Sequence, residues 1–501
     1  MQEIKLYHST RSRSVTASPS QAVLQGIAPD GGLYTLDAYS SETADYRHLL
    51  DLDTLEMTAE ILSSLLPDYG RGKMRSIVRD AYRDKYTSEV LTPVVPAGEN
   101  GMLELFHGPT SAFKDFALSI LPFLMRESSV LCGSQNEVLI LTATSGDTGK
   151  AALEGFRDVK GTRIIVFYPD QGVSPIQKAQ MVTQSGNNVC VCAVRGNFDD
   201  AQNGVKQIFT SDHIRQILHS RAVCLSSANS INIGRLAPQV VYYFIAYREM
   251  IKLGRIRCGD LLDYSVPTGN FGDILAGFIA RQMGLPVGKL ICASNANCVL
   301  TDFLRTGVYD RCRPFHLTLS PSMDILISSN LERLLYLISQ DADLVKKLMD
   351  DLKNSGRYTI PAFMLEELQD VFFPAFCNDQ ETLHTIREVW DHYHYLCDPH
   401  TAVAWNAAEQ YHKAFPAHHP TVVLATASPY KFPSAIQEAL GIASVGNGYE
   451  TMRNLSSLTG VPVPPNLKNL ESKPVLHTDV IDKEAMSDYV LAKAVEKQWN
   501  R

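Results

Sequence analysis

The chain has 501 residues, of which 45% are hydrophobic and 20% charged, and its formal net charge at pH 7 is −8. This length exceeds one ordinary domain, and the balance of residues is that of a globular protein with buried cores. The acidic surplus argues against nucleic acid or an anionic membrane as a partner, because both select for basic surfaces. The first residues lack the apolar segment of a secretory signal, and no apolar stretch reaches about 18 residues. We therefore expect a cytoplasmic location and no membrane span.

The ten cysteines are scattered and contain no C-x-x-C pair. Cys190 and Cys192 lie in a short apolar run, where residues i and i+2 face the same side of a strand. This pattern favours buried free thiols over a zinc site or a disulfide framework.

Short apolar or β-branched runs alternate with amphipathic stretches between residues 90 and 440, after a mainly helical section at 1–90. Strands are expected at 138–143, 163–168, 188–194, 262–266, 290–293 and 422–425. This alternation predicts βαβ units and a mainly parallel sheet, which is an α/β fold. Residues 320–415 are expected to be helical. The tail is expected to be turn-rich from about 450 and helical at 482–497.

Lys114 lies in the sequence FHGPTSAFKDF, residues 106–116, just before an apolar helix expected at 117–125. Thr110 or Ser111 is expected to cap this helix after a Gly-Pro turn. The first helical turn would then hold Lys114 between two phenylalanines, where the helix dipole and partial desolvation both lower the pKa of its amine. A neutral amine forms an imine with an aldehyde cofactor. From spacing alone, a lysine that extends its charge into solvent is the commoner interpretation.

The strand expected at 262–266 runs into PTGNFGD, residues 267–273, and then into a helix expected at 274–283. A glycine-containing loop at a helix N-terminus presents backbone N–H groups and the positive end of the helix dipole to an anion. Gly269 and Gly272 let the backbone approach phosphate oxygens closely. An ordinary strand-to-helix turn is an equal alternative. The loop matches neither G-x-G-x-x-G nor a Walker loop, so no dinucleotide or nucleoside triphosphate is indicated.

Two further loops place hydroxyl groups at the ends of expected strands. TATSGDTGK, residues 142–150, opens a helix at 151–156, and its hydroxyl and N–H groups suit a carboxylate or phosphate or simply cap the helix. TASPYKF, residues 426–432, begins with Thr426 at the end of a buried strand. A hydroxyl there can bond an unprotonated pyridine nitrogen, whereas a carboxylate would hold the ring protonated. Alone, this loop is more simply a strand-end turn.

Together these loops and further motifs resemble the threonine synthases, which are pyridoxal-phosphate (PLP) enzymes of fold type II. The motifs cover most of the chain in the family's order. They are STR from Ser9, APDGGLY from Ala28, HGPTSAFKDFAL around Lys114, SGDTGKAALEGF from Ser145, NSINIGRLAPQ from Asn229, PTGNFGDILAG from Pro267, SNANCVLTDFLRTG from Ser294, PSMDILISSNLERLLY from Pro321, DPHT from Asp398 and ATASPYKFP from Ala425.

The resemblance implies a tryptophan synthase β-like fold and a role for each matching residue. Lys114 would form the Schiff base with PLP and then shuttle protons, and Thr426 would face the pyridine nitrogen. The residues implied for the cofactor phosphate are Gly269, Asn270, Phe271, Gly272 and Asp273. Those implied for the substrate are Ser145, Gly146, Asp147, Thr148, Asn229, Ser230, Arg235 and, more weakly, Lys150, for which a solvated helix lysine is the favoured interpretation. Arg235 could grip the substrate phosphate with two parallel hydrogen bonds.

The resemblance also implies four domains: a mainly helical one at 1–90, a small α/β PLP domain at 91–230, a large α/β PLP domain at 231–450 with a helical insertion at about 320–415, and a tail at 451–501. Many family members have a histidine where this chain has Ser428, so the role of position 428 stays open. Monomer and homodimer are equally consistent with the sequence.

The implied reaction converts O-phospho-L-homoserine and water into L-threonine and phosphate, with PLP as the electron sink. One alternative is a phospho-lyase relative that releases 2-oxobutyrate and ammonia from the same substrate. Another is a catalytically silent relative that binds an amino acid. Measuring threonine and 2-oxobutyrate together distinguishes a threonine synthase from the phospho-lyase. A silent relative is expected to lack the lysine, the phosphate loop or the hydroxyl.

Overall fold

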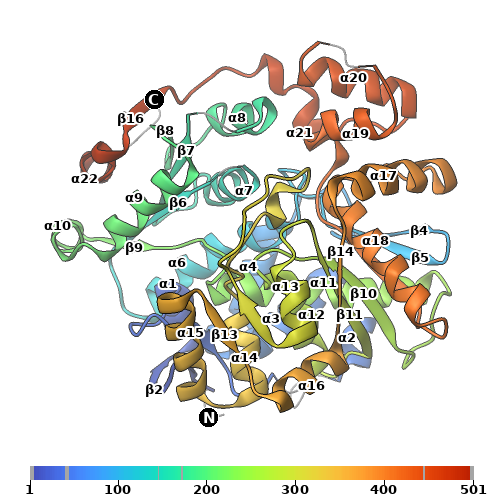
Figure 1. Cartoon of the computed structure of the whole chain (residues 1–501). Coiled ribbons are helices and arrows are strands. Elements are labelled where there is room, and N and C mark those ends of the chain that lie inside the picture. The colour runs from blue at the N-terminus through green and yellow to red at the C-terminus, as the bar shows by residue number, and fades with distance from the viewer. Residues whose placement is uncertain (1–4, 40–44, 145, 171–172, 444–445, 497–501) are drawn as a thin grey trace.

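The computed structural model describes residues 5–39, 45–144, 146–170, 173–443 and 446–496, and its main features are two sheets, each flanked by helices (Figure 1). The smaller sheet has the strand order β16-β8-β7-β6-β9, and all its neighbouring strands are parallel. Its strands are β6 (Glu137–Ala143), β7 (Thr162–Pro169), β8 (Val189–Arg195), β9 (Val223–Ser226) and β16 (Asp479–Asp482). The three strands expected between residues 138 and 194 are confirmed.

The larger sheet has the order β14-β11-β10-β15-β5-β4, and only its β4–β5 pair is antiparallel. Its strands are β4 (Val94–Ala97), β5 (Asn100–Glu104), β10 (Leu262–Pro267), β11 (Val287–Ser294), β14 (Phe372–Phe376) and β15 (Thr421–Ala425). The expected strands at 262–266, 290–293 and 422–425 are confirmed, and so is the mainly parallel character. The division of the chain at residues 90, 230 and 450 stays a prediction.

Alternating side chains give the inner strands β6, β7 and β8 of the smaller sheet two buried faces. Val138 and Ile140 pack in the core that includes α7 (Asp147–Phe156) and α8 (Pro175–Val182), whereas Leu139 and Leu141 pack with three other helices. Those helices are α9 (Phe198–Thr210), α10 (Asp212–Ser220) and α22 (Met486–Val495). Such continuous apolar runs are what a parallel sheet covered on both faces requires.

The larger sheet is covered in the same way. Tyr264 and Val266 of β10 belong to the core that contains α11 (Ile233–Lys252) and α12 (Gly272–Gln282). On the other face, α18 (Pro399–Ala414) packs on β10, β11, β14 and β15. Five of the ten cysteines, including the Cys190–Cys192 pair of β8, are buried and the other five are not, so the expectation of buried thiols holds for half of them.

The N-terminal section begins with an antiparallel sheet of β1 (Tyr7–Ser9), β2 (Ser12–Ala17) and β3 (Tyr34–Thr35), so the expectation of a mainly helical start is incomplete. The helices that follow are α1 (Pro19–Gln25), α2 (Tyr46–Asp51), α3 (Thr54–Leu65) and α4 (Arg71–Tyr82). Arg11 donates two hydrogen bonds of 2.8 Å to Glu332 of α14 (Leu331–Ser339), which fixes this section to the helical region.

Residues 320–415 are mostly helical, as expected, but contribute β14 to the larger sheet. This region also contains α15 (Ala342–Ser355), β13 (Arg357–Thr359), α16 (Ala362–Val371) and α17 (Asp379–Tyr393), and it is preceded by α13 (Val299–Thr306) and β12 (Val308–Asp310). After β15 the chain forms α19 (Pro433–Ala439), α20 (Gly448–Thr459) and α21 (Pro465–Lys468), followed by β16 and α22, which lie beside β8 and α9 in Figure 1. No helix within the described ranges combines the length and apolar character of a membrane span.

Candidate active site

Lys114 is the first residue of α5 (Lys114–Leu118), as the sequence predicted. The predicted caps are wrong. The hydroxyl and backbone N–H of Thr110 donate instead to the carboxylate of Asp115, at 2.5 and 2.8 Å, and the Ser111 hydroxyl donates to Asn466 at 3.0 Å. The expected single helix at 117–125 is also divided, because α5 ends at Leu118 and α6 (Leu121–Leu131) follows it.

The loop that carries Lys114 is fixed against the loop that follows β15. Phe113 donates its N–H to the carbonyl of Thr426 at 2.8 Å, and Ala112 forms an isolated β-bridge with Ala427. Phe116 is fully buried, and its carbonyl accepts a 2.7 Å hydrogen bond from the Tyr82 hydroxyl. Two strand ends of the larger sheet, β5 and β15, therefore bring Lys114 and Thr426 into one site.

The Lys114 amine lies 4.6 Å from the centroid of the Phe113 ring and donates to the Ser322 hydroxyl at 3.3 Å. Burial lowers the pKa of Lys114. The charges of Lys431 and Arg235 lower this pKa further, while the carboxylates of Asp147 and Asp273 oppose them. A lysine with a depressed pKa has a larger neutral fraction, which is the form that attacks a carbonyl carbon.

The loop predicted to bind phosphate runs from the end of β10 into α12. Phe271 is the N-cap of α12 in the left-handed region, with φ of 62°, and its side chain provides no cap hydrogen bond. A Cβ on Gly269 would lie 2.7 Å from the carbonyl oxygen of Ser322, whereas one on Gly272 would meet nothing closer than 3.5 Å. A methyl group would therefore fit beside Gly272 at ordinary contact distances, at a helix terminus that attracts anions.

Asn330 joins two predicted binding segments. Its backbone and side-chain N–H groups donate to the carbonyl of Asn270 at 3.0 and 3.1 Å, and its side chain also donates to the carbonyl of Ser230 at 3.1 Å. Arg333 in turn bonds Asn330 and the carbonyl of Tyr34. The phosphate loop and the segment around Ser230 are thus held together. Asn229, next to Ser230, has an exposed side chain.

Arg235 lies in the first turn of α11 and is 3% exposed. Its Nη1 donates to the carbonyl of Ala228 at 2.7 Å, but its buried Nε has no hydrogen-bond partner among the described residues. Burial lowers the pKa of this guanidinium to about 10, and its charge acts on Lys114. A buried donor without an acceptor is costly, and an anionic ligand would satisfy it.

Asp147 connects the smaller sheet to the Lys114 loop. Its carboxylate lies 2.7 Å from the Lys431 ammonium, whose Nζ also donates to the carbonyl of Thr110 at 3.1 Å, and both side chains are almost fully buried. Gln177 donates to the same carboxylate at 3.1 Å. A Cβ on Gly146 would lie 2.5 Å from the Gln177 amide, so a larger residue at this position would displace the Gln177 side chain that bonds Asp147. Thr148 is partly buried beside it, and Ser145 lies outside the described residues.

Family models built from known proteins match most of the chain. One described as "Pyridoxal-phosphate dependent enzyme" matches residues 92–427, one described as "Threonine synthase N terminus" matches 6–82, and one described as "Threonine synthase, C-terminal" matches 401–490. The threonine synthase of Pseudomonas aeruginosa is 37% identical over 437 residues, which are 86% of this chain and 90% of that protein. This chain belongs to the threonine synthase family.

Two further relatives define the extent of the similarity. Human threonine synthase-like 1 is 38% identical over 439 residues, which cover 85% of this chain but only 58% of that protein. The crystal structure of PLP-bound threonine synthase from Brucella melitensis has a TM-score of 0.86 and 36% identity, and the match covers 98% of this chain and all of that one. The fold is therefore PLP fold type II, as the resemblance implied, and the family's cofactor is PLP.

The residues present fit PLP. The structure offers a partly desolvated lysine amine, an α12 N-terminus without a side-chain cap from its N-cap residue, and, beside Gly272, the side-chain amide groups of Asn330 and Gln239. Thr426, 4% exposed, stands at the end of β15 next to the Lys114 loop. These features match the aldehyde, phosphate and ring nitrogen of the cofactor in chemical type.

Lys150 and Ser428 differ from the other predicted positions. The Lys150 ammonium is held by Gln184 and Glu154, and its side chain is only 12% exposed, so its interpretation as a solvated helix lysine is wrong. Burial lowers the pKa of Lys150 to about 8. Ser428 is buried, donates its N–H to the carbonyl of Ser111 at 3.1 Å and accepts from the N–H of Tyr430 at 3.4 Å. Its hydroxyl thus stabilises a turn against the Lys114 loop.

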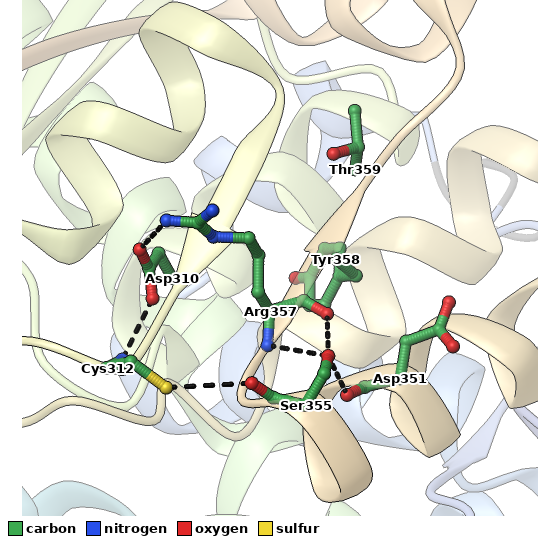
Figure 2. Close-up of a pocket in the computed structure, with 7 residues that line it drawn as sticks. All are labelled: Asp310, Cys312, Asp351, Ser355, Arg357, Tyr358 and Thr359. Atoms are coloured by element: carbon green, nitrogen blue, oxygen red, sulfur yellow. Dashed lines mark hydrogen bonds and ion pairs between the residues drawn. The ribbon is translucent and has the colours of Figure 1, made fainter.

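Sequence reasoning missed Ser322, Asn330, Lys431 and His400 as members of the site, although all four lie in the motifs that carry the family resemblance. A separate surface pocket, between the antiparallel β12–β13 pair and α15, contains none of the predicted residues (Figure 2). There the Arg357 guanidinium is already paired with Asp310, and the Cys312 thiol bonds the carbonyl of Ser355. We assign no chemistry to that pocket.

Proposed function

We propose that this family member is a threonine synthase, which converts O-phospho-L-homoserine and water into L-threonine and phosphate. The observation that carries the proposal is that one buried site contains two basic side chains. They are the Lys114 amine, whose pKa is lowered, and the Arg235 guanidinium, which has an N–H without an acceptor among the described residues. The first suits an aldehyde cofactor and proton transfer, and the second suits a phosphorylated substrate.

In the proposal, PLP is held by Lys114, by the backbone of Gly269, Asn270, Phe271, Gly272 and Asp273, and by the Thr426 hydroxyl. Bound there, PLP supplies the electron sink that lets protons leave the substrate carbons. The neutral Lys114 amine takes and returns the proton at Cα, because its lowered pKa increases the fraction of the amine that is unprotonated. The Thr426 hydroxyl can donate to an unprotonated ring nitrogen.

The remaining predicted residues would bind the substrate. Arg235 offers its free Nε–H to the phosphate, and the neighbouring Asn229–Ser230 segment is fixed beside the phosphate loop by Asn330. The loop of Gly146, Asp147 and Thr148 begins α7 and suits the substrate carboxylate, because helix N-termini favour anions. Ser145 is included in this proposal on the strength of its motif.

The test is an assay of the purified, PLP-loaded protein with O-phospho-L-homoserine, in which L-threonine, phosphate, 2-oxobutyrate and ammonia are all measured. We expect equimolar threonine and phosphate, and loss of both in Lys114→Ala. Lys346→Ala, which removes an exposed lysine of α15, is the matched control and should retain full activity. Release of 2-oxobutyrate and ammonia would make the protein a phospho-lyase, and no turnover with PLP bound would make it a silent relative.

A further inference from the structure

The turn that contains Ser322 contacts both the reactive lysine and the phosphate loop. The Lys114 amine donates to the Ser322 hydroxyl at 3.3 Å. A Cβ on Gly269 would lie 2.7 Å from the carbonyl oxygen of Ser322, so the turn packs closely against the phosphate loop. This turn, η2 (Pro321–Met323), is a single turn of 3₁₀ helix. A small movement of so short an element would change the direction of the lysine amine and the shape of the loop together.

A buried histidine holds this turn. The Nε2 of His400 accepts the backbone N–H of Ser322 at 3.1 Å, and its Nδ1 lies 2.7 Å from Oδ1 of Asp398. A backbone N–H can only donate, so Nε2 must be unprotonated and the ring proton must be on Nδ1, directed at the carboxylate. His400 is 2% exposed and Asp398 is fully buried, which keeps water from competing for either bond.

Asp398 fixes the histidine to a rigid element. It is the N-cap of α18, accepts the backbone N–H of His400 at 2.9 Å and also accepts the Thr401 hydroxyl. The helix packs on β10, β11 and β15 of the larger sheet. A series of contacts therefore connects the larger sheet, through α18 and His400, to Ser322 and the Lys114 amine.

We propose that His400, oriented by Asp398, is a positioning residue of the site: by accepting the N–H of Ser322 it fixes the Ser322 hydroxyl at the Lys114 amine and the Ser322 backbone against Gly269. This inference rests on the proposed role of Lys114 in holding PLP. It goes beyond that role because it assigns a function to Ser322, Asp398 and His400, which are far from Lys114 in the sequence. The competing explanation is that His400 merely stabilises the beginning of α18.

Two substitutions separate the explanations because they keep different halves of the imidazole. In His400→Gln the side-chain oxygen reaches the Nε2 position and can accept from Ser322, whereas in His400→Asn the amide stays near Nδ1 and can bond only Asp398. The measured quantities are the dissociation constant for PLP, from its absorbance on titration into the cofactor-free full-length protein, and the melting temperature of that protein. His412→Leu removes a histidine from the far end of the same helix, where it bonds Thr421, and is the control.

We expect His400→Asn to weaken PLP binding about tenfold, the value of one hydrogen bond, and His400→Gln to restore most of the affinity. Ser322→Ala should weaken binding similarly, and the double variant Ser322→Ala/His400→Asn should be little worse than either single variant, since both act through one contact. The control should bind PLP like the wild type. Equal affinity in the Asn and Gln variants, with both lowering the melting temperature alike, would overturn the proposal in favour of a purely structural histidine.

The experiment also distinguishes this inference from the proposed function. It uses PLP alone, so its result does not depend on which product the enzyme forms. If the wild type binds PLP but makes no threonine, the proposed function fails and the Asn and Gln variants still decide the role of His400. If the wild type binds no PLP, both proposals fail.

Discussion

Arg235 has a buried N–H without an acceptor, and this defines a prediction at the scale of a single residue. If the group holds the substrate phosphate, Arg235→Ala should lower kcat/KM for O-phospho-L-homoserine by about 100-fold or more, since each charged hydrogen bond is worth about 1.5–3 kcal/mol. Arg235→Lys should have a kcat/KM between those of the wild type and Arg235→Ala, because lysine keeps the positive charge but cannot form two parallel hydrogen bonds to a phosphate. Steady-state kinetics measures the effect.

Arg255→Ala is the control for Arg235, because Arg255 is exposed just beyond the opposite end of α11 and should not affect turnover. An Arg235→Ala enzyme with unchanged kcat/KM would place the phosphate elsewhere. PLP affinity should fall less than kcat/KM in this variant, since the guanidinium is proposed to bind the substrate.

Asp273 supports a prediction about pH. Burial raises the pKa of its carboxyl to about 6, although it lies in the first turn of α12, where the helix dipole favours a negative charge. The folded protein therefore holds this proton more tightly than the unfolded one. The protonated Asp273 carboxyl therefore stabilises the fold fully below about pH 4. This stabilisation, about 3 kcal/mol, is lost as the pH rises to about 6.

Asp273→Asn stays neutral and should escape this loss. Its melting temperature without cofactor should therefore gain on that of the wild type as the pH rises from 4 to 7, and calorimetry at several pH values measures the gain. Asp115, whose pKa burial also raises to about 6, is present in both proteins and cancels in the comparison. Asp199→Asn, in the exposed first turn of α9, should show no such trend. A constant difference across this range would contradict the raised pKa.

At the scale of elements, the β10–α12 loop contains two glycines with different reasons to be glycine. A methyl group on Gly269 would collide with the Ser322 backbone, so Gly269→Ala should lower both the melting temperature of the cofactor-free protein and the affinity for PLP. A methyl group on Gly272 meets only ordinary contacts in the chain, so Gly272→Ala should leave that melting temperature unchanged and still weaken PLP binding. If Gly272→Ala binds PLP normally, the phosphate does not approach this residue.

The strands that the sequence predicted correctly are buried runs rich in apolar or β-branched residues, such as those of β6 and β7. Two of the strands that it missed lack that signal: β14 contains a proline and β16 is polar and mostly exposed. The first turn of α5 was predicted, but not its cap. Asp115, next to the lysine, accepts both Thr110 donors, and local sequence does not show which of two nearby partners prevails.

The candidate site divides in the same way. Lys114, Gly269 and Thr426 could be proposed from the sequence because each lies in a recognisable loop, after a strand or at the start of a helix. Ser322 and His400 could not be predicted, because their roles depend on contacts with residues far away in the sequence. Periodicity and turn chemistry are local signals and contain no information about such pairs.

At the scale of the whole molecule, the ion pair between Lys431 and Asp147 joins the two sheets. Lys431 follows β15 of the larger sheet, and Asp147 begins α7, which follows β6 of the smaller sheet. Lys431→Met leaves a buried carboxylate without its partner, which should cost about 3–5 kcal/mol and lower the melting temperature. Adding Asp147→Asn should restore much of the loss. Lys483→Met, which breaks an exposed pair with Asp200, should have almost no effect.

The pair also fixes the sign of a pH effect. Lys431 holds the pKa of Asp147 well below its usual range, against the opposing effect of burial. The pair therefore stabilises the fold above the ordinary carboxyl pKa of about 4 and loses this effect as the pH falls further. The gap in melting temperature between wild type and Lys431→Met should narrow in acid. A gap that is constant with pH would show that the destabilisation comes from lost packing alone.

The pairing of β5 with β15, and of β8 with β16, has a consequence for biogenesis. During translation β5 is synthesised long before β15, and β8 long before β16. The nascent polypeptide therefore carries unpaired strand edges until these partners appear, a condition in which chaperones are needed and premature termination leads to aggregates.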